Sequence, residues 1–493
     1  MKKLGSISKA LWRGLLVMFP AVMYFSYFPV ISLGGNETMN FELSLPLIWL
    51  MVFDVVGVLA LVRRLGWGMF VGAVRAGRRK WWWLMFPVWA TISVGWSLNA
   101  VRGLLTAGIV WLIVVAVLLV VKLRDVIDEG CRVWWWRVFF GAGVVACVWC
   151  VVQCVLDLAG VGRDYSLMCA GCVSGMFGFP HPNGFAIEPQ FMGNLLLAPT
   201  LAAGYFGLKN KKYLVLFGIF ASAIFLTFSR GAIYAMGVGL TVMMVIMFAR
   251  ARRKGLKMVA KKVAVMVGVM VAAFLFALNL QGIMAAVGPT NDSYFDGVAK
   301  VVNHLTLGVV EIRGNDGVSA SVGGADVGGA DDSSLEEVDD FDDGGADAKA
   351  EAVFDGYVAE STETRLRLTG AAVEVWRSSF PNVMVGVGLG GAGQALYDAG
   401  LSPAPKEIVQ NEYASLLLET GVIGISLFVV LVVLVVRWVW RQGRGRVMVV
   451  ALIVAYGVTL LFFSGLANAV HIYLLPVMLV VIGLSPEKVQ QRA

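Results

Sequence analysis

The chain has 493 residues, of which 58% are hydrophobic and 15% charged, and its mean hydropathy is +0.78. A water-soluble domain cannot bury that much apolar surface, so the composition indicates an integral membrane protein. The pI near 9.0 would suggest nucleic acid binding in a soluble chain. Here the basic residues lie in short loops between apolar runs, where they set membrane orientation, so we expect no nucleic acid partner.

Apolar runs long enough to cross a bilayer as helices recur along the whole chain. The first run is too long for a signal peptide and no small-residue cleavage site follows it, so we expect it to stay in the membrane. Twelve spans are predicted, at about residues 14–33, 43–62, 81–98, 103–121, 134–156, 186–208, two within 213–249, 263–280, 414–436, 447–465 and 469–484.

The basic residues also predict the orientation. Lys2, Lys3, Lys9 and Arg13 precede the first span, so the N-terminus is expected in the cytoplasm. Twelve spans then return the C-terminus to the same side and leave 30 of the 40 lysines and arginines there. We predict an all-α polytopic membrane protein with about 12 transmembrane helices and one large extracytoplasmic loop.

That loop is residues 281–411, and its charge differs from that of the rest of the chain. It carries 21 of the 33 acidic residues and seven of the 40 lysines and arginines, a net charge of about −14. Amphipathic helices are predicted at 293–312 and 364–378, and a disordered acidic insert near 314–352. The predicted organisation is spans one to nine in 1–280, the loop in 281–411, and spans ten to twelve with a cytoplasmic tail in 412–493.

One arginine interrupts a long apolar stretch. Residues 213–249 carry a single charge, Arg230, and the stretch has the length of two spans with basic residues at both ends. Arg230 is therefore expected at the outward turn of a hairpin. A charge in such a place tends to be functional, and a guanidinium grips phosphate oxygens in a bidentate way. The alternative is an arginine that reaches the lipid headgroups.

Polar residues also gather where two other spans begin. Glu412 and Glu419 form a stripe with Ser415 on the outer half of the tenth span, preceded by Gln410 and Asn411. Polar packing between helices is the alternative interpretation. Glu188 stands beside Pro189 at the start of the sixth span, where a broken helix end can line a cavity.

Several common site types are missing from the sequence. The glycine-rich run 385–391 follows no strand of a βαβ unit, so it is not a nucleotide-binding fingerprint. Neither a metal-ligand cluster nor an Asp-x-Asp motif occurs outside the acidic insert. We therefore expect no cofactor, no metal, and a donor that is not a nucleotide sugar.

Residues 225–232, 364–390 and 410–424 form three segments with polar or glycine-rich motifs. Together these segments resemble the O-antigen ligase and Wzy-type O-antigen polymerase superfamily of membrane glycosyltransferases. They match the family's Ser-Arg-Gly hairpin, its loop helix with a following Gly-Val-Gly turn, and the pattern that opens the span after the long loop. A fourth, looser match contains His181. The loose match covers residues 179–183.

The resemblance implies a GT-C-type enzyme of the bacterial cytoplasmic membrane. Such enzymes move glycan from an undecaprenyl-diphosphate-linked oligosaccharide to a glycan or lipid-glycan acceptor on the outer face, among membrane lipids. It implies that Arg230 holds the diphosphate and that Arg365 or Arg367 assists, since cations stabilise a leaving diphosphate. Asn411, Glu188 and Arg377 are further candidates for substrate binding.

One departure from the family pattern concerns the general base. Ligases of the family carry a histidine where this chain has Gln410, and an amide cannot act as a base. Glu412 is the first candidate to replace it, His181 the second and Glu188 the third. The departure favours a polymerase, or a ligase-like transferase with another acceptor. Arg377 and Gly388, with ten residues between them, weakly resemble a polymerase loop motif.

Two other classes of function compete with a glycosyltransferase. A transporter or flippase of lipid-linked saccharide is expected to show repeat symmetry between its halves, and the single large loop late in the chain shows none. A membrane scaffold without chemistry leaves Arg230 unexplained.

Overall fold

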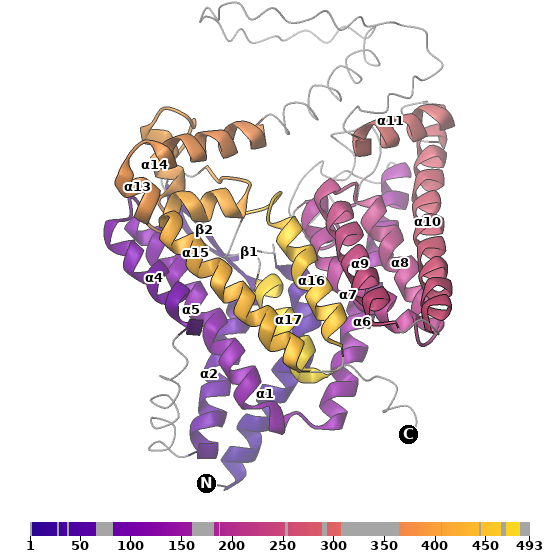
Figure 1. The fold of residues 1–493 in the computed structure, drawn as a ribbon, viewed down its shortest axis with the longest axis horizontal. Coiled ribbons are helices and arrows are strands. Elements are labelled where there is room, and N and C mark those ends of the chain that lie inside the picture. The colour runs from indigo at the N-terminus through magenta and orange to yellow at the C-terminus, as the bar shows by residue number, and fades with distance from the viewer. Residues whose placement is uncertain are drawn as a thin grey trace, which may run out of the picture.

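The protein is a bundle of apolar helices with a smaller helical layer at one end (Figure 1). The predicted insert at 314–352 lies outside the residues that the computed structural model describes. Those residues are 2–26, 29–36, 39–65, 82–159, 182–186, 188–251, 255–287, 293–306, 364–405, 407–442, 445–464 and 470–483.

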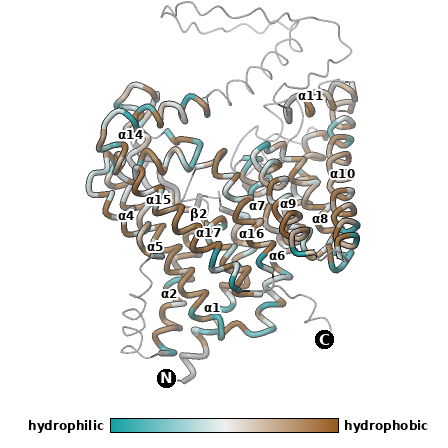
Figure 2. Tube along the Cα trace, viewed as in Figure 1, coloured by the Kyte–Doolittle hydropathy of each residue, from teal (hydrophilic) through white to brown (hydrophobic). Residues whose placement is uncertain are grey.

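Six of the described helices are long and apolar enough to cross a membrane, and three more are apolar but shorter. Hydrophobic residues fill the middle of these helices and hydrophilic ones gather near their ends (Figure 2). The chain is thus a multi-pass membrane protein. The long helices are α2 (Leu45–Leu65), α5 (Ala100–Lys122), α6 (Glu129–Leu158), α9 (Arg230–Arg250), α10 (Leu256–Val287) and α15 (Glu412–Arg441), and the shorter ones α8 (Lys212–Leu226), α16 (Arg446–Thr459) and α17 (Val470–Ile482).

The remaining helices include both of those predicted in the long loop. Residues 364–377 are helical, and α11 falls inside the predicted 293–312. The bounds are α1 (Lys2–Val22), α4 (Met85–Ser93), α7 (Pro189–Gly207), α11 (Tyr294–Thr306), α13 (Phe380–Val385) and α14 (Ala392–Asp398), with short 3-10 turns η1 (Met23–Phe25), η3 (Val94–Trp96) and η4 (Arg124–Val126).

The described residues form the predicted all-α fold apart from one short hairpin, which corrects the predicted first span. Helix α1 ends at Val22, and an antiparallel hairpin of β1 (Pro29–Asn36) and β2 (Met39–Ser44) follows, with Leu33 opposite Phe41. A span at 14–33 is therefore wrong in its second half. The physical reason is local, because Pro29 disfavours a helical residue before it and β-branched residues follow. Hydropathy alone does not distinguish such a strand from a helix.

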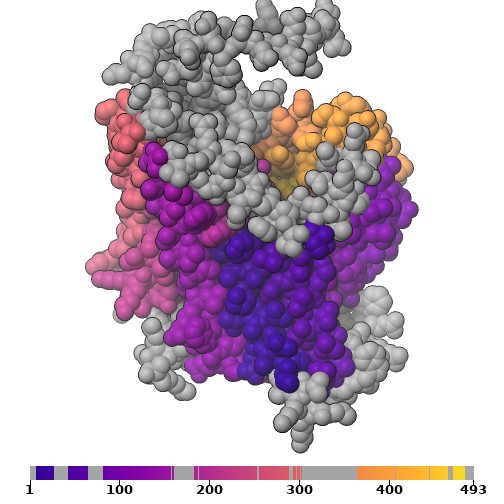
Figure 3. All heavy atoms as spheres, turned by 180° about the vertical axis from the view of Figure 1, so that it is seen from behind, coloured from indigo at the N-terminus to yellow at the C-terminus, as the bar shows by residue number. Residues whose placement is uncertain are grey.

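Helix α7 forms the centre of the bundle. Nearly all of its residues are buried, and it packs against α8, α9 and α16. One hydrophobic core joins these helices to α1, α2, α5, α6 and α17. Seen from behind, the first third of the chain covers much of one face (Figure 3). The start of α7 is therefore held among packed neighbours, which matters because Glu188 directly precedes it.

A glycine-rich turn joins the end of the long loop to the bundle. Gly386, Gly388 and Gly390 have φ values of +73°, +91° and +79°, which only glycine adopts without strain. The Gly388 amide donates to the Glu419 carbonyl at 2.9 Å, and the Ser97 hydroxyl donates to the Leu389 carbonyl at 2.7 Å. The turn thus lies between α15 and the segment before α5.

This turn attaches the part of the loop that contains the helix at 364–377 to the bundle. Its apolar face, with Leu368, Ala371 and Ala372, packs in a second hydrophobic core with Val409 and Leu418. The amphipathic helix predicted at 364–378 is confirmed, with one apolar side buried. The helix lies with α13 and α14 at one end of the bundle, and α1 begins at the opposite end (Figure 1).

Candidate active site

The first turns of α7, α9 and α15 meet at residues 460–464, the segment that follows α16. Each contributes one contact with this segment. The Glu412 amide donates to the Leu460 carbonyl at 2.9 Å, a Cβ placed on Gly231 would lie 3.1 Å from Phe462, and the rings of Phe191 and Phe463 are 5.1 Å apart. Three helix N-termini, each with a partial positive charge, therefore surround one region, an arrangement that favours an anion.

Arg230 is the first residue of α9, at the hairpin turn expected from the sequence. Helix α8 ends at Leu226, and the Ser229 hydroxyl caps α9 by accepting from the Ala232 amide at 3.3 Å. Helix α7 passes close by, since a Cβ placed on Gly193 would lie 2.7 Å from Ala232. The position of Arg230 is therefore fixed by close packing.

A short polar network holds Arg365 at the start of α7, within electrostatic range of Arg230. The Arg365 Nη2 group donates to Gln190 Oε1 at 3.2 Å, and Gln190 Nε2 donates to Glu188 Oε2 at 2.8 Å. The charges of Arg365 and Arg230 are close enough to repel each other. Burial raises the pKa of Glu188, while the Arg365 charge and the Gln190 hydrogen bond lower it in part. Two cations held in this way attract anions, and guanidinium groups bind phosphate oxygens well.

The start of α15 lies on the other side of the 460–464 segment. The Glu412 side chain is buried, and its Oε2 accepts from the Ser464 hydroxyl at 3.0 Å. Asn411 caps α15, because its Oδ1 accepts from the amides of Tyr413 and Ala414, both at 3.1 Å. Gln410 Oε1 is buried and has no hydrogen-bond partner among the described residues. An acceptor atom is thus left open beside a buried carboxylate.

Residues 215–429 match the O-antigen ligase family. The chain contains an O-antigen ligase domain. It begins in α8 and ends in α15, so it includes Arg230, Arg365 and Gln410. The resemblance noted from the sequence is therefore confirmed, and a glycan-transferring enzyme that acts on lipid-linked glycans is indicated. No curated protein matches the chain.

The O-antigen ligase domain holds only part of this cluster. Glu188 and Gln190 precede the domain, and Ser464 follows it. Gln190 is two residues from Glu188 in the sequence, but a single glutamine does not indicate that it will bind Arg365. Ser464 could not be found either, because it follows a separate span and meets Glu412 only through the fold.

The remaining candidate residues differ in their surroundings. Arg367 and Arg377 are exposed on the helix at 364–377, whereas Arg365 is half-buried. His181 lies outside the described residues. Asn411 lies at the site, and its side-chain oxygen is engaged in capping. No group of three potential metal ligands occurs in the described part of the chain.

Glu419, the second carboxylate of the predicted stripe on α15, contacts the end of the glycine-rich turn. Glu419 Oε1 accepts from the Ala392 amide at 3.5 Å, and its charge interacts with that of Arg102. Helix α15 bends just after it, at Gly421, where φ is +65°. The predicted stripe of Glu412, Ser415 and Glu419 is thus divided between two different surroundings.

Proposed function

We propose that the protein transfers or polymerises glycan units from an undecaprenyl-diphosphate-linked donor on the outer face of the bacterial cytoplasmic membrane. The observation that carries the proposal is the pairing of Arg230 with Arg365. The two cations come from different parts of the O-antigen ligase domain. Two like charges held close together make the site positive, which favours the binding of an anionic ligand.

The donor's diphosphate binds between Arg230 and Arg365, near the N-termini of α7 and α9. In the reaction, the bond between the sugar's anomeric carbon and the phosphate oxygen breaks, and undecaprenyl diphosphate leaves with the bonding electrons. The negative charge on the leaving oxygen grows in the transition state, so fixed guanidinium groups stabilise it most there. Glu188 acts through Gln190, which orients Arg365.

Glu412 removes the proton from the attacking acceptor hydroxyl. Its carboxylate is held by Ser464, and a carboxylate is a common general base in enzymes. Gln410 Oε1 orients the acceptor by accepting from one of its hydroxyl groups, in place of the family's histidine. His181 remains the second candidate for the base. The acceptor is a glycan or a lipid-linked glycan, and both polymerase and ligase chemistry fit these roles.

The proposal includes the predicted topology. Twelve spans keep both termini in the cytoplasm and bring Arg230, the loop helix and Glu412 to the outer face. Membrane lipids surround the spans, and no cofactor takes part. The alternative function is a transporter or flippase of lipid-linked saccharide, which needs the arginines for binding but no base.

The test uses full-length protein in vesicles with a lipid-linked oligosaccharide and a glycan acceptor, and it measures the transferred product. Arg230→Ala should lower turnover about a hundredfold or more, as the loss of one charge-stabilising donor does in other enzymes. Lys211→Ala, which removes an exposed cation from the opposite end of α8, is the matched control. Unchanged transfer by Arg230→Ala defeats the proposal. Movement of the labelled lipid across the bilayer without any product supports the flippase.

A further inference from the structure

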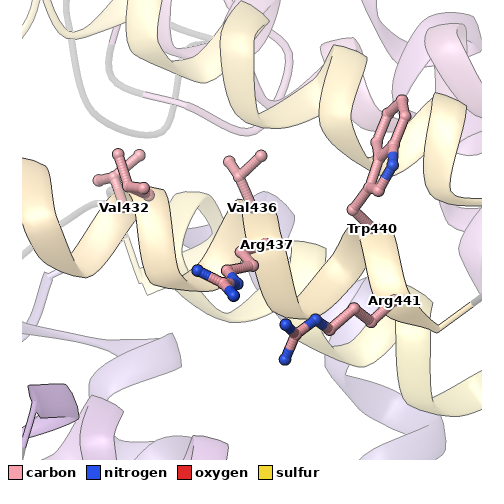
Figure 4. A pocket seen from close by; sticks show the side chains of 6 residues that line it. Val432, Val436, Arg437, Trp440 and Arg441 are labelled. Carbon is pink, nitrogen blue, oxygen red and sulfur yellow. The ribbon is translucent and has the colours of Figure 1, made fainter.

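A groove lies on α15 far from the proposed active site. Six residues of the last turns of the helix line it, three of them valines at the end nearer the membrane centre. Figure 4 shows Arg437 and Arg441 extending side by side, while Val432, Val436 and Trp440 form the neighbouring row. The lining residues are Val432, Val433, Val436, Arg437, Trp440 and Arg441.

The two rows follow from the helical repeat. Residues four apart share a face, so Val433, Arg437 and Arg441 stand in line. Along this line the helix changes from apolar to basic. Val433 is 57% exposed and Val429, one turn earlier, is 52% exposed. In a membrane-spanning helix such exposed valines contact lipid chains.

Two arginines outside the groove add to the positive charge at this end of α15. Arg250, the last residue of α9, lies with its Cζ 4.5 Å from the centre of the Trp440 ring, and Arg446 Cζ lies 5.1 Å from it. The ring therefore holds two further arginines by cation–π contacts. Arg446 also donates to the Trp440 carbonyl at 3.2 Å.

Within the described part of the chain, none of these four arginines belongs to an ion pair. The ion pairs there join Arg13 to Asp128 and both Arg64 and Arg124 to Asp125. Four cations from three helices, with an apolar row leading away from them, match the two parts of a charged lipid. A phosphate headgroup complements the arginines, and an acyl chain complements the valines.

We infer that this groove binds an anionic diacyl phospholipid. The headgroup phosphate lies between Arg437 and Arg441, and one acyl chain follows Val433 and Val429. Helix α15 is 30 residues long, so roughly 40 Å separates this groove from Glu412. It is therefore a second lipid site, distinct from the proposed donor site, and it does not depend on the transferase function.

The test measures lipids that stay bound to the purified full-length protein. Detergent-solubilised protein is incubated with phosphatidylglycerol or phosphatidylcholine, and retained lipid is counted by native mass spectrometry. We expect the wild type to retain phosphatidylglycerol preferentially. Arg437→Gln combined with Arg441→Gln should weaken that preference about thirtyfold, because each cation near an anionic lipid surface strengthens binding about fivefold.

The control is Lys211→Gln combined with Lys212→Gln, which removes the same charge from exposed residues at the start of α8. It should retain the lipid like the wild type. An equal loss in both double variants would mean nonspecific surface charge and overturn the site. Unchanged retention in the arginine variant overturns it as well. Excess inorganic phosphate should not displace the lipid; complete displacement would show that the valines contribute nothing and contradict a lipid ligand.

Discussion

Helix α15 carries two carboxylates two turns apart, and their surroundings differ. Glu419 lies against the amide of Ala392, near Arg102, within the docked glycine turn. Glu412 is buried at the helix start, where Ser464 donates to it and Gln410 leaves an acceptor atom open. Glu419 is held by groups that also attach the loop to the bundle. Glu412 accepts from the Ser464 hydroxyl, and Gln410, two residues earlier, has a side-chain oxygen without a donor among the described residues.

This difference separates a structural role from a chemical one. A carboxylate that binds backbone amides and a cation stabilises the fold, and another ligand there would have to displace those partners. A buried carboxylate beside an open acceptor atom can exchange a proton with a substrate. Glu419 therefore helps to attach the loop, and Glu412 is the residue that we propose as the base. Both residues belong to the same predicted polar stripe.

The sharpest test of the comparison is Glu412→Gln. The amide has the same shape but cannot take a proton, so turnover should fall about a hundredfold or more. Binding of the lipid-linked donor should change little, because the arginines that hold it are untouched. Turnover and donor affinity are measured separately in the vesicle assay. Wild-type turnover would remove Glu412 as the base and leave His181 as the next candidate.

A smaller effect, a loss of stability, is expected when the glycine-rich turn is changed. A Cβ on Gly386 would lie 2.5 Å from the Glu419 carbonyl group, and its φ of +73° strains any side chain. Gly386→Ala should lower stability by ~2 kcal/mol, measured as a lower midpoint of thermal unfolding. Gly370→Ala, on the helix at 364–377 with open space around the position, is the control and should unfold at or slightly above the wild-type midpoint, because alanine favours a helix.

Glu419→Gln should have a weaker effect, and on stability alone. The amide keeps an acceptor for Ala392 but loses the charge opposite Arg102, which should cost ~1 kcal/mol. The unfolding midpoint falls, while turnover below that midpoint stays near the wild-type value. A loss of turnover as deep as that of Glu412→Gln would break the division of roles between the two carboxylates.

Deleting residues 316–350 should have the smallest effect. Their composition predicts that they cannot bury enough apolar surface to fold, so they should act as a linker. Transfer from the lipid-linked donor should remain within about twofold of the wild type, since neither binding nor chemistry is assigned to them. A complete loss of transfer in correctly inserted protein would show that the insert takes part in the reaction.

Local patterns in the sequence determined much of this protein. Apolar runs predicted the long helices, and a single charge in 213–249 located the hairpin turn at Arg230, because both features depend on nearby residues only. The amphipathic pattern at 364–377 also gave the buried face correctly. The hairpin at 29–44 was missed because hydrophobicity is common to strands and helices.

Only the tertiary structure decided which polar groups meet. Arg365 and Arg367 are two residues apart and therefore lie on nearly opposite sides of their helix. The glycine turn fixes how that helix docks, and the result brings Arg365, not Arg367, to Gln190. Likewise Ser464 reaches Glu412 across 52 residues of chain. Such contacts depend on how helices are rotated and packed against each other, which no local pattern of residues specifies.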